Sequence, residues 1–118
     1  MAFSNYICYL FAGNTSMRNT VEIIVCQGKS ADLCCPQAQI LKFQEVFYGR
    51  PEGCTCQCDI CHNLTQTCSA NASIALGKLE EKCAQGSKCS VRATENEFGN
   101  PCKGIKKILV IKFSCLDS

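Results

Sequence analysis

The cysteine content of this chain limits its fold more than any other feature of the sequence. Thirteen of the 118 residues are cysteine, which exceeds the share of about 8–10% that is typical of small disulfide scaffolds. Disulfides persist in the extracellular space and the secretory pathway. Each bridge that closes a loop of tens of residues contributes about 2–4 kcal/mol to stability. The sequence therefore predicts a secreted or extracellular domain that disulfides hold together.

One domain accounts for most of the chain, because 118 residues leave no room for a second independent core. We assign residues 21–118 to this domain and residues 1–20 to an N-terminal segment. Residues 6–13 are apolar and precede the first charge, Arg18. The segment is therefore either the remnant of a signal peptide or an additional strand. No apolar run approaches the roughly 20 residues of a membrane span, so we expect no such span.

The charge pattern excludes one class of partner. The net charge is only +2 and the charged residues are scattered, which argues against nucleic acid. The densest basic stretch, residues 103–112, is interleaved with isoleucine and valine and has the pattern of a strand. Three N-x-S/T sequons agree with a secretory route and predict glycosylation. They begin at Asn14, Asn63 and Asn71.

Hydrophobic periodicity predicts several strands. The stretches with a β-branched run or a period of two are residues 21–26, 40–48, 89–92 and 107–115. In residues 40–48 the alternation predicts that Leu41, Phe43 and Phe47 share one face. In residues 107–115 the alternate side chains from Leu109 to Cys115 share a face in the same way.

The sequence predicts one helix, over about residues 72–84. Apolar side chains recur there at helical spacing on one stripe. Asn71 is a suitable N-cap, and the charged residues between 78 and 82 fall on the opposite side. The members of the stripe are Ala72, Ala75, Leu76, Leu79 and Cys83.

The residues give no catalytic motif, and we expect a protein that is not an enzyme and needs no cofactor. The only histidine, His62, lies in a cysteine-rich loop, where a reduced thiol partner conflicts with an oxidising compartment. The same loop has the C-x-C and C-x-x-C spacings of a Zn²⁺ site. It lacks a second pair of ligands at a suitable distance, so we favour disulfides and no metal. A cysteine-rich metal-binding or thiol protein is the alternative.

The odd number of cysteines has its own consequence. With thirteen cysteines, at least one is unpaired, joined to another chain or removed with the N-terminal segment. Cys8 is the candidate for removal. Otherwise, the remaining alternatives are one unpaired cysteine or a covalent dimer.

Three short motifs resemble one known family. Residues 98–109, with the sequence FGNPCKGIKKIL, are similar to the closing signature of the sea-urchin-egg-lectin family, also called the galactose- or rhamnose-binding lectin domain. Tyr48-Gly49-Arg50 is similar to its other hallmark, and residues 83–89 resemble the small bridged loop after its helix. The resemblance implies an α+β, mainly β fold. We expect an antiparallel β-sandwich of about five strands with one α-helix.

The resemblance also implies a set of disulfides. It pairs Cys83 with Cys89 and Cys68 with Cys102, and it leaves alternatives for two other bridges. Cys115 pairs with Cys34 or Cys35, and Cys26 pairs with one of Cys54, Cys56, Cys58 or Cys61.

The family's ligands are cell-surface or secreted glycans with terminal galactose- or rhamnose-like sugars. Its sugar site maps onto Gln27, Tyr48, Glu95, Asn100, Gly104 and Lys107. The resemblance implies carboxylates at two of these positions, where this chain has the amides Gln27 and Asn100, and an asparagine where it has Glu95. Two lost charge-assisted hydrogen bonds cost on the order of 1–3 kcal/mol, or about tenfold to a hundredfold in affinity. The sequence leaves two functions open: a sugar-binding domain with weakened affinity, or the same fold as an extracellular protein-interaction module.

Overall fold

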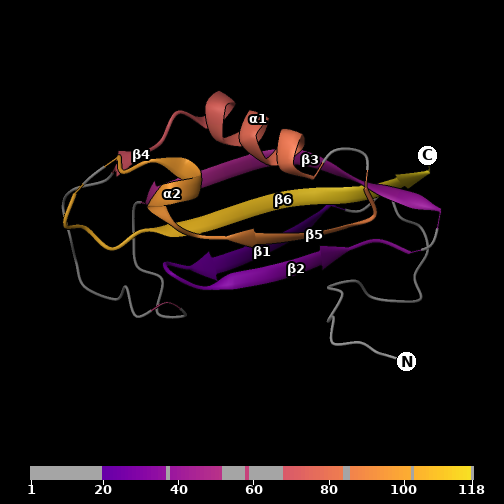
Figure 1. The fold of residues 1–118 in the computed structure, drawn as a ribbon, viewed down its shortest axis with the longest axis horizontal. Helices are drawn as coiled ribbons and strands as arrows, with labels where there is room; N and C mark the ends of the chain where they lie inside the picture. Colours follow the sequence, from indigo (N-terminus) through magenta and orange to yellow (C-terminus); the bar gives the residue numbers. More distant parts are fainter. Residues whose placement is uncertain are drawn as a thin grey trace.

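The computed structural model describes residues 20–36, 38–51, 58, 68–83, 86–101 and 103–117. The expectations for residues 1–19, for His62 and for most of the cysteine-rich loop lie outside this part of the chain. The described elements, in chain order, are β1 (Val21–Cys26), β2 (Ser30–Cys34), β3 (Gln39–Arg50), β4 (Cys68–Ser69), α1 (Ala72–Lys82), β5 (Lys88–Arg92), α2 (Glu95–Phe98) and β6 (Ile108–Asp117) (Figure 1).

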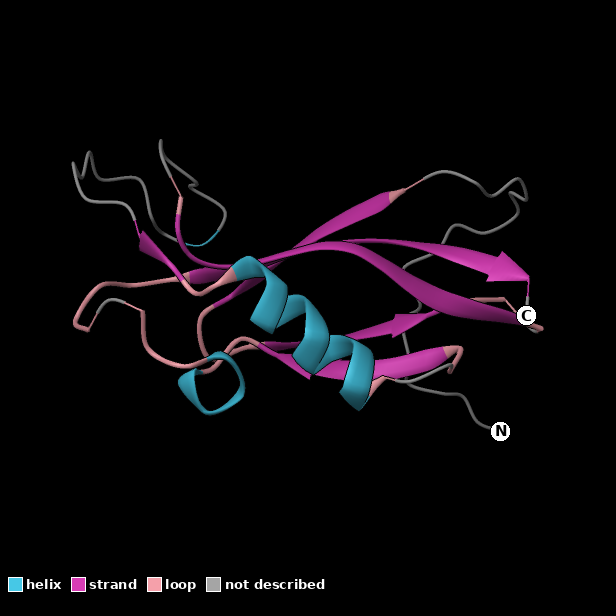
Figure 2. Cartoon of the chain, turned by 90° about the horizontal axis from the view of Figure 1, so that it is seen from above, coloured by secondary structure: helices cyan, strands magenta, loops and turns pink. Residues whose placement is uncertain are grey.

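These strands form two antiparallel sheets. The larger sheet has the strand order β1-β6-β3-β4, and the smaller one pairs β2 with β5. In Figure 1 the strands of both sheets run along the long axis of the molecule, and α1 lies beside β3. Figure 2 shows α1 running obliquely over the strands, with α2 near its side. The predicted mainly β fold class is confirmed, with β2, β4 and α2 as additional elements.

One hydrophobic core joins the two sheets and α1. Leu33 of β2 and Val91 of β5 are fully buried in the same cluster as Leu109 and Phe113 of β6 and Leu79 of α1. Each buried Leu or Phe side chain stabilises the fold by about 1.5–3 kcal/mol relative to an exposed one. The small sheet is therefore held to the large one by apolar packing as well as by covalent bonds.

A β-bulge changes the face on which β3 presents its side chains. The pairing of β3 with β6 shifts register between Phe43 and Glu45, which inserts one extra residue into β3. After the bulge, Val46 and Tyr48 join Phe43 in the core. Phe47 is only half-buried and lies outside that core cluster. The prediction that Phe47 shares a face with Leu41 and Phe43 was wrong, because a period of two was counted across the bulge.

Helix α1 has the expected N-cap and a shorter buried stripe than predicted. The Asn71 side chain accepts a hydrogen bond from the Ile74 N–H at 3.1 Å. Ala75, Leu79 and Cys83 are buried, whereas Ala72 is exposed. Ala72 is the first residue of the helix, and the first buried member of the apolar stripe is Ala75, about one helical turn later.

Three elements were absent from the sequence prediction. Strand β4 has only two residues, and α2 has only four, so neither carries a periodic pattern. Strand β2 reads SADLC, a mixture with little β propensity. It is a strand because it pairs with β5 along all five residues and buries Leu33.

The structure contains three disulfides whose two ends are both described. Cys83 is bonded to Cys89, Cys35 rather than Cys34 is bonded to Cys115, and Cys58 is the loop cysteine bonded to Cys26. Cys34 and Cys68 are disulfide-bonded as well. Cys102, the expected partner of Cys68, lies outside the described residues. The described helices include none that is long and apolar enough to cross a bilayer.

Gly49 gives the first test of this fold. A Cβ at this position would lie 2.1 Å from the carbonyl oxygen of Cys68, which is on the paired strand β4. We expect Gly49→Ala to lower the free energy of unfolding by about 1–3 kcal/mol, as overpacking does elsewhere. Urea unfolding of the oxidised protein, followed by circular dichroism, measures the change.

Gly77→Ala is the matched control for this substitution. A Cβ at Gly77, on the exposed side of α1, meets no atom within 4 Å. Alanine there should raise stability by about 0.5–1 kcal/mol through helix propensity. If Gly49→Ala unfolds at the wild-type urea concentration, the close approach of β4 to β3 is not a constraint on the fold.

Candidate functional site

Sheet register brings two of the expected site segments together at one end of the molecule. Cys26, the last residue of β1, pairs with Ile108, the first residue of β6. The turn that begins at Gln27 therefore lies beside the segment that ends at Lys107. Ile108 also pairs with Gly49 on the other side, so the end of β3 reaches the same place.

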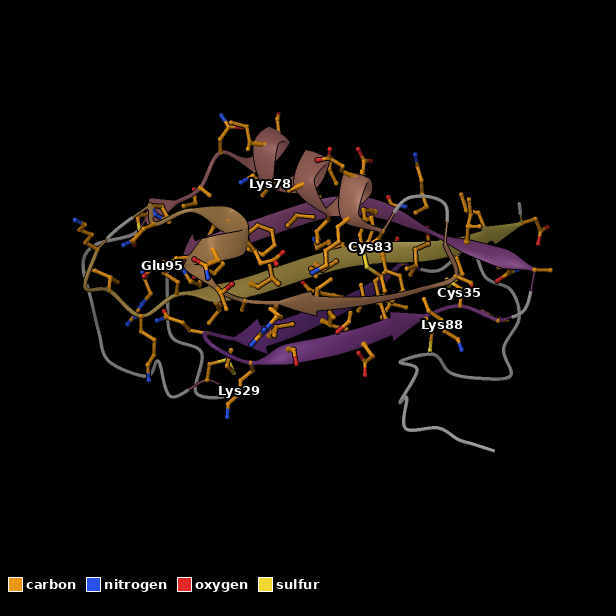
Figure 3. All side chains as sticks on the ribbon, in the orientation of Figure 1. Lys29, Cys35, Lys78, Cys83, Lys88 and Glu95 are labelled. Atoms are coloured by element: carbon orange, nitrogen blue, oxygen red, sulfur yellow. A yellow bond between two sulfur atoms is a disulfide. The ribbon has the colours of Figure 1, made fainter. Side chains whose placement is uncertain are left out.

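Backbone hydrogen bonds bring a third segment to this end. The Gly28 N–H donates to the Ala93 carbonyl at 2.8 Å, and the Ala93 N–H donates to the Lys29 carbonyl at 2.9 Å. These bonds join the β1–β2 turn to the residues just before α2. Figure 3 shows Glu95 on α2 and Lys29 toward the same end of the molecule, away from the end with Cys35 and Lys88. We call the residues 27–29, 48–50, 93–101 and 103–107 the convergent end.

A side-chain hydrogen bond connects Gln27 directly to Lys107. The Gln27 Oε1 accepts from the backbone N–H of Lys107 at 2.6 Å. The Lys107 Nζ donates to the Ile105 carbonyl at 2.6 Å, and the Lys107 side chain is only 2% exposed. Two residues from opposite ends of the chain are thus held in contact. The Lys107 ammonium lies inside the protein and not on its surface.

Tyr48 is fully buried, with 0% of its surface exposed. Its ring packs against Phe98 of α2, with 5.2 Å between ring centroids. Its hydroxyl is buried and has no hydrogen-bond partner among the described residues. Burial, and secondarily the negative charge of Glu95, raise the pKa of Tyr48 above its ordinary value of 10.0. Tyr48 therefore packs on the helix that carries Glu95, although no hydrogen bond joins the two residues within the described chain.

Asn100 and Gly104 lie in the connection between α2 and β6 and are exposed, like Gln27 and Glu95. Gly104 has a φ of 78°, in the left-handed region that favours glycine. Within the described residues, no hydrogen bond joins Asn100 or Gly104 to another expected site residue. The structure thus brings Gln27 to Lys107 and Tyr48 to the helix that carries Glu95. It places Asn100 and Gly104 in the connection at the same end, with no hydrogen bond to the other expected site residues among those described.

Arg50 contributes to this end in a way that the site prediction omitted. Its side chain is 4% exposed, and Nη1 donates to the Lys106 carbonyl at 3.0 Å. Arg50 therefore fastens the connection before β6 to the end of β3. The only sequence signal was its place in the Tyr48-Gly49-Arg50 motif, which does not reveal the partner.

The exposed groups at this end suit a ligand rich in hydroxyls. Glu95 is acceptor-only when ionised, whereas the amide of Asn100 both donates and accepts. Exposed lysines supply further donors. Among the described residues, no three Cys, His, Asp or Glu side chains are placed to hold a metal ion. The loop with the zinc-like spacing lies outside them, apart from Cys58, which is bonded to Cys26.

Comparison with known proteins finds a consistent set of relatives. A family model described as the D-galactoside/L-rhamnose binding SUEL lectin domain matches residues 33–115. This range includes every expected site residue except Gln27. The L-rhamnose-binding lectin ELEL-1 of Echinometra lucunter is 32% identical over 92 residues, which cover 77% of this chain and 86% of that protein.

Two further relatives differ in how much of their own length the match covers. The D-galactoside-specific lectin of Heliocidaris crassispina is 29% identical over 95 residues, covering 77% of this chain and 86% of the lectin. Beta-galactosidase 6 of Oryza sativa subsp. japonica is 32% identical over 92 residues, covering 75% of this chain but only 10% of the enzyme.

The buried phenol of Tyr48 predicts a pH dependence. Because its pKa is raised in the folded state, the unfolded chain releases this proton first as the pH rises above about 10. The contribution of Tyr48 to stability is therefore complete below pH 10 and is lost as the pH rises toward the folded pKa. A spectrophotometric titration of phenolate formation, wild type minus Tyr48→Phe, should show a phenol that ionises above pH 10.

Tyr48→Phe also tests the unpartnered hydroxyl. Removing a buried polar group that has no partner is neutral or stabilises by about 1 kcal/mol at neutral pH. The other two tyrosines, Tyr6 and Tyr9, titrate in both proteins and cancel in the difference. A Tyr48 phenol that ionises at or below pH 10 would contradict its placement in the core.

Proposed function

This chain belongs to the SUEL lectin domain family, and we propose that it binds glycans with terminal galactose- or rhamnose-like sugars at the convergent end. The observation that carries the proposal is the hydrogen bond between Gln27 Oε1 and the Lys107 N–H, 2.6 Å long. It holds the β1–β2 turn against the residues before β6, two segments that the family resemblance assigns to one sugar site.

In this proposal the site residues divide by burial. Gln27, Glu95, Asn100 and Gly104 are exposed and contact the sugar, whose hydroxyls pair with amide, carboxylate and backbone groups. Tyr48 and Lys107 are buried and support these residues from beneath. Arg50 fixes the connecting segment through its bond to Lys106.

We further propose that the domain acts outside the cell and without catalysis. The three described disulfides support an oxidising compartment. A match that covers 10% of a β-galactosidase supports a role as a binding module within some enzymes. Asn71 is exposed, and its cap uses only the side-chain oxygen, which leaves the amide nitrogen for a glycan. Asn14 and Asn63 lie outside the described residues.

A protein-interaction module without sugar binding is the second candidate. The amides at Gln27 and Asn100 favour it, because they give up the charge-assisted hydrogen bonds that carboxylates make to hydroxyls. The partner in that case is an extracellular protein. If a folded sample binds no glycan on a broad array, the result would support this candidate.

Asn100→Asp tests the sugar site. The substitution restores the carboxylate that the family resemblance implies and should increase binding to neutral terminal galactose or rhamnose about tenfold. The measurement is binding of oxidised protein to a glycan array, with the protein presented multivalently because single lectin sites bind modestly. Gln27→Glu should act in the same direction.

Asn71→Asp is the control for the added charge, and it is compared with Asn100→Asp in a Ser73→Ala background, because Asn71→Asp by itself would also remove the glycan proposed at Asn71. It makes the same change at the N-cap of α1, where aspartate caps as well as asparagine, and should leave sugar binding unchanged. If neither the wild type nor Asn100→Asp binds any glycan while both are folded, the sugar-binding proposal is wrong.

Thiol titration tests the oxidised state of the chain. With thirteen cysteines, we expect no more than one free thiol in a monomer, or none in a disulfide-linked dimer. The measurement is reaction with a thiol reagent in guanidinium chloride, together with non-reducing electrophoresis. Three or more free thiols in freshly secreted protein would favour the metal-binding alternative.

A further inference from the structure

A groove lies between β3, β6 and the first turns of α1. Its volume is about 420 Å³, within the range of about 300–1,000 Å³ that is typical of ligand sites. The described residues that line it are residues 44–47 of β3, Ala72, Ser73 and Leu76 of α1, and Val110 and Lys112 of β6. None of them belongs to the convergent end. We call it the β3–α1 groove.

The floor of the β3–α1 groove is apolar and includes an aromatic ring. Phe47 is half-buried and lies outside the main core cluster, because the bulge in β3 directs it away from that cluster. It lies opposite Val110 in the pairing of β3 with β6. Val46 and Leu76 add further apolar surface to the groove. The exposed part of the Phe47 ring is therefore available to an apolar surface that enters the groove.

Polar groups line the same groove. Glu45 and Lys112 are paired across the two strands, with 3.4 Å between a carboxylate oxygen and the ammonium. Gln44 and Ser73 are exposed and supply an amide and a hydroxyl. A sugar ring has apolar C–H faces, and its hydroxyls need donors and acceptors of this kind at its edge. The lining of the groove therefore suits a sugar.

A glycan attachment point lies directly beside the groove. Asn71, Ala72 and Ser73 form an N-glycosylation sequon, and its second and third residues line the groove. Asn71 is exposed, and its Oδ1 accepts the capping hydrogen bond from the Ile74 N–H. The Nδ2 atom, which carries an N-linked glycan, takes no part in that bond. Because consecutive Cα atoms are about 3.8 Å apart, the first sugar on Asn71 starts within one residue of the groove.

We propose that the N-acetylglucosamine attached to Asn71 packs into the β3–α1 groove, with a C–H face of its ring on Phe47. Its hydroxyl and acetamido groups lie toward the polar lining. The inference uses the glycosylation proposed above for Asn71 and does not involve the convergent end. A tethered sugar has a high effective concentration at the groove, so it packs there although a free monosaccharide would bind weakly. The packed sugar covers the exposed part of Phe47 and stabilises the fold.

Thermal unfolding with and without the glycan tests this packing. The full-length chain is secreted from a eukaryotic host with Asn14→Gln and Asn63→Gln, so that only the Asn71 sequon remains, and the glycan is trimmed to its first sugar. Asn71→Asp gives the form without a glycan and keeps the helix cap. We expect the sugar to raise Tm by about 3–6 °C. In Phe47→Leu the sugar should raise Tm by about 1 °C or less.

Ile74→Ala is the matched control. Ile74 is an apolar side chain that is 59% exposed, lies three residues from Asn71 and is not among the residues that line the groove. Its truncation should preserve the full effect of the sugar on Tm. Each variant is compared with and without the sugar, so an overall loss of stability in Phe47→Leu and any effect of the aspartate cancel in the difference.

Nuclear magnetic resonance of the glycoprotein provides a measurement that does not depend on a variant at Phe47. With isotopically labelled N-acetylglucosamine, we expect nuclear Overhauser contacts between the Phe47 ring and the first sugar. Protons on the packed face of the sugar should also be shifted upfield by the ring current.

Three results would overturn the inference. They are an Asn71 that mass spectrometry finds unmodified in secreted protein, a sugar effect on Tm that is equal in wild type and Phe47→Leu, and a sugar without contacts to the Phe47 ring. Loss of the effect in Ile74→Ala alone would place the sugar outside the groove and also contradict it. The glycan array tests the convergent end separately, so failure of the sugar-binding proposal would leave this inference intact.

Discussion

The antiparallel pairing of β3 with β6 is the interaction on which the rest of the structure depends. It runs from Gln39 opposite Asp117 to Gly49 opposite Ile108 and is the longest ladder described. β1 pairs with the other edge of β6, and α1 packs against β3. The inward side chains of these two strands supply seven of the sixteen buried residues in the main core cluster, to which the smaller sheet also contributes. Removing this ladder would separate β1 and β6 from β3, β4 and α1.

The same ladder controls the convergent end through one irregularity. The bulge after Phe43 exchanges the two faces of the strand, so that Tyr48 enters the core and packs on Phe98. Gly49 then allows β4 to approach closely, and Arg50 reaches the Lys106 carbonyl. Three consecutive residues thus have three different structural tasks. Together they determine where the connection before β6 lies, and with it the exposed groups that we assign to the ligand.

Three disulfides supplement the apolar core in the described part of the chain. Cys35–Cys115 joins the residue that follows β2 to β6, near the Gln39–Asp117 end of the β3–β6 pairing. The two cysteines are 80 residues apart in sequence. Cys26–Cys58 fastens part of the cysteine-rich loop to the end of β1, next to Gln27. Cys83–Cys89 closes the short connection between α1 and β5. Each lies where a sheet or helix ends, so the covalent bonds hold the ends while apolar packing holds the middle.

The sequence by itself determined the features that depend on local pattern. Cysteine density predicted the disulfide scaffold, periodicity predicted α1 and four strands, and short motifs indicated the family and its site positions. The tertiary structure decided which cysteine of the Cys34–Cys35 pair meets Cys115, which face carries Phe47, and that Arg50 holds Lys106. These are long-range choices. A slip of one residue in register exchanges the faces of a strand, and nothing in the local spacing of residues records where such a slip occurs.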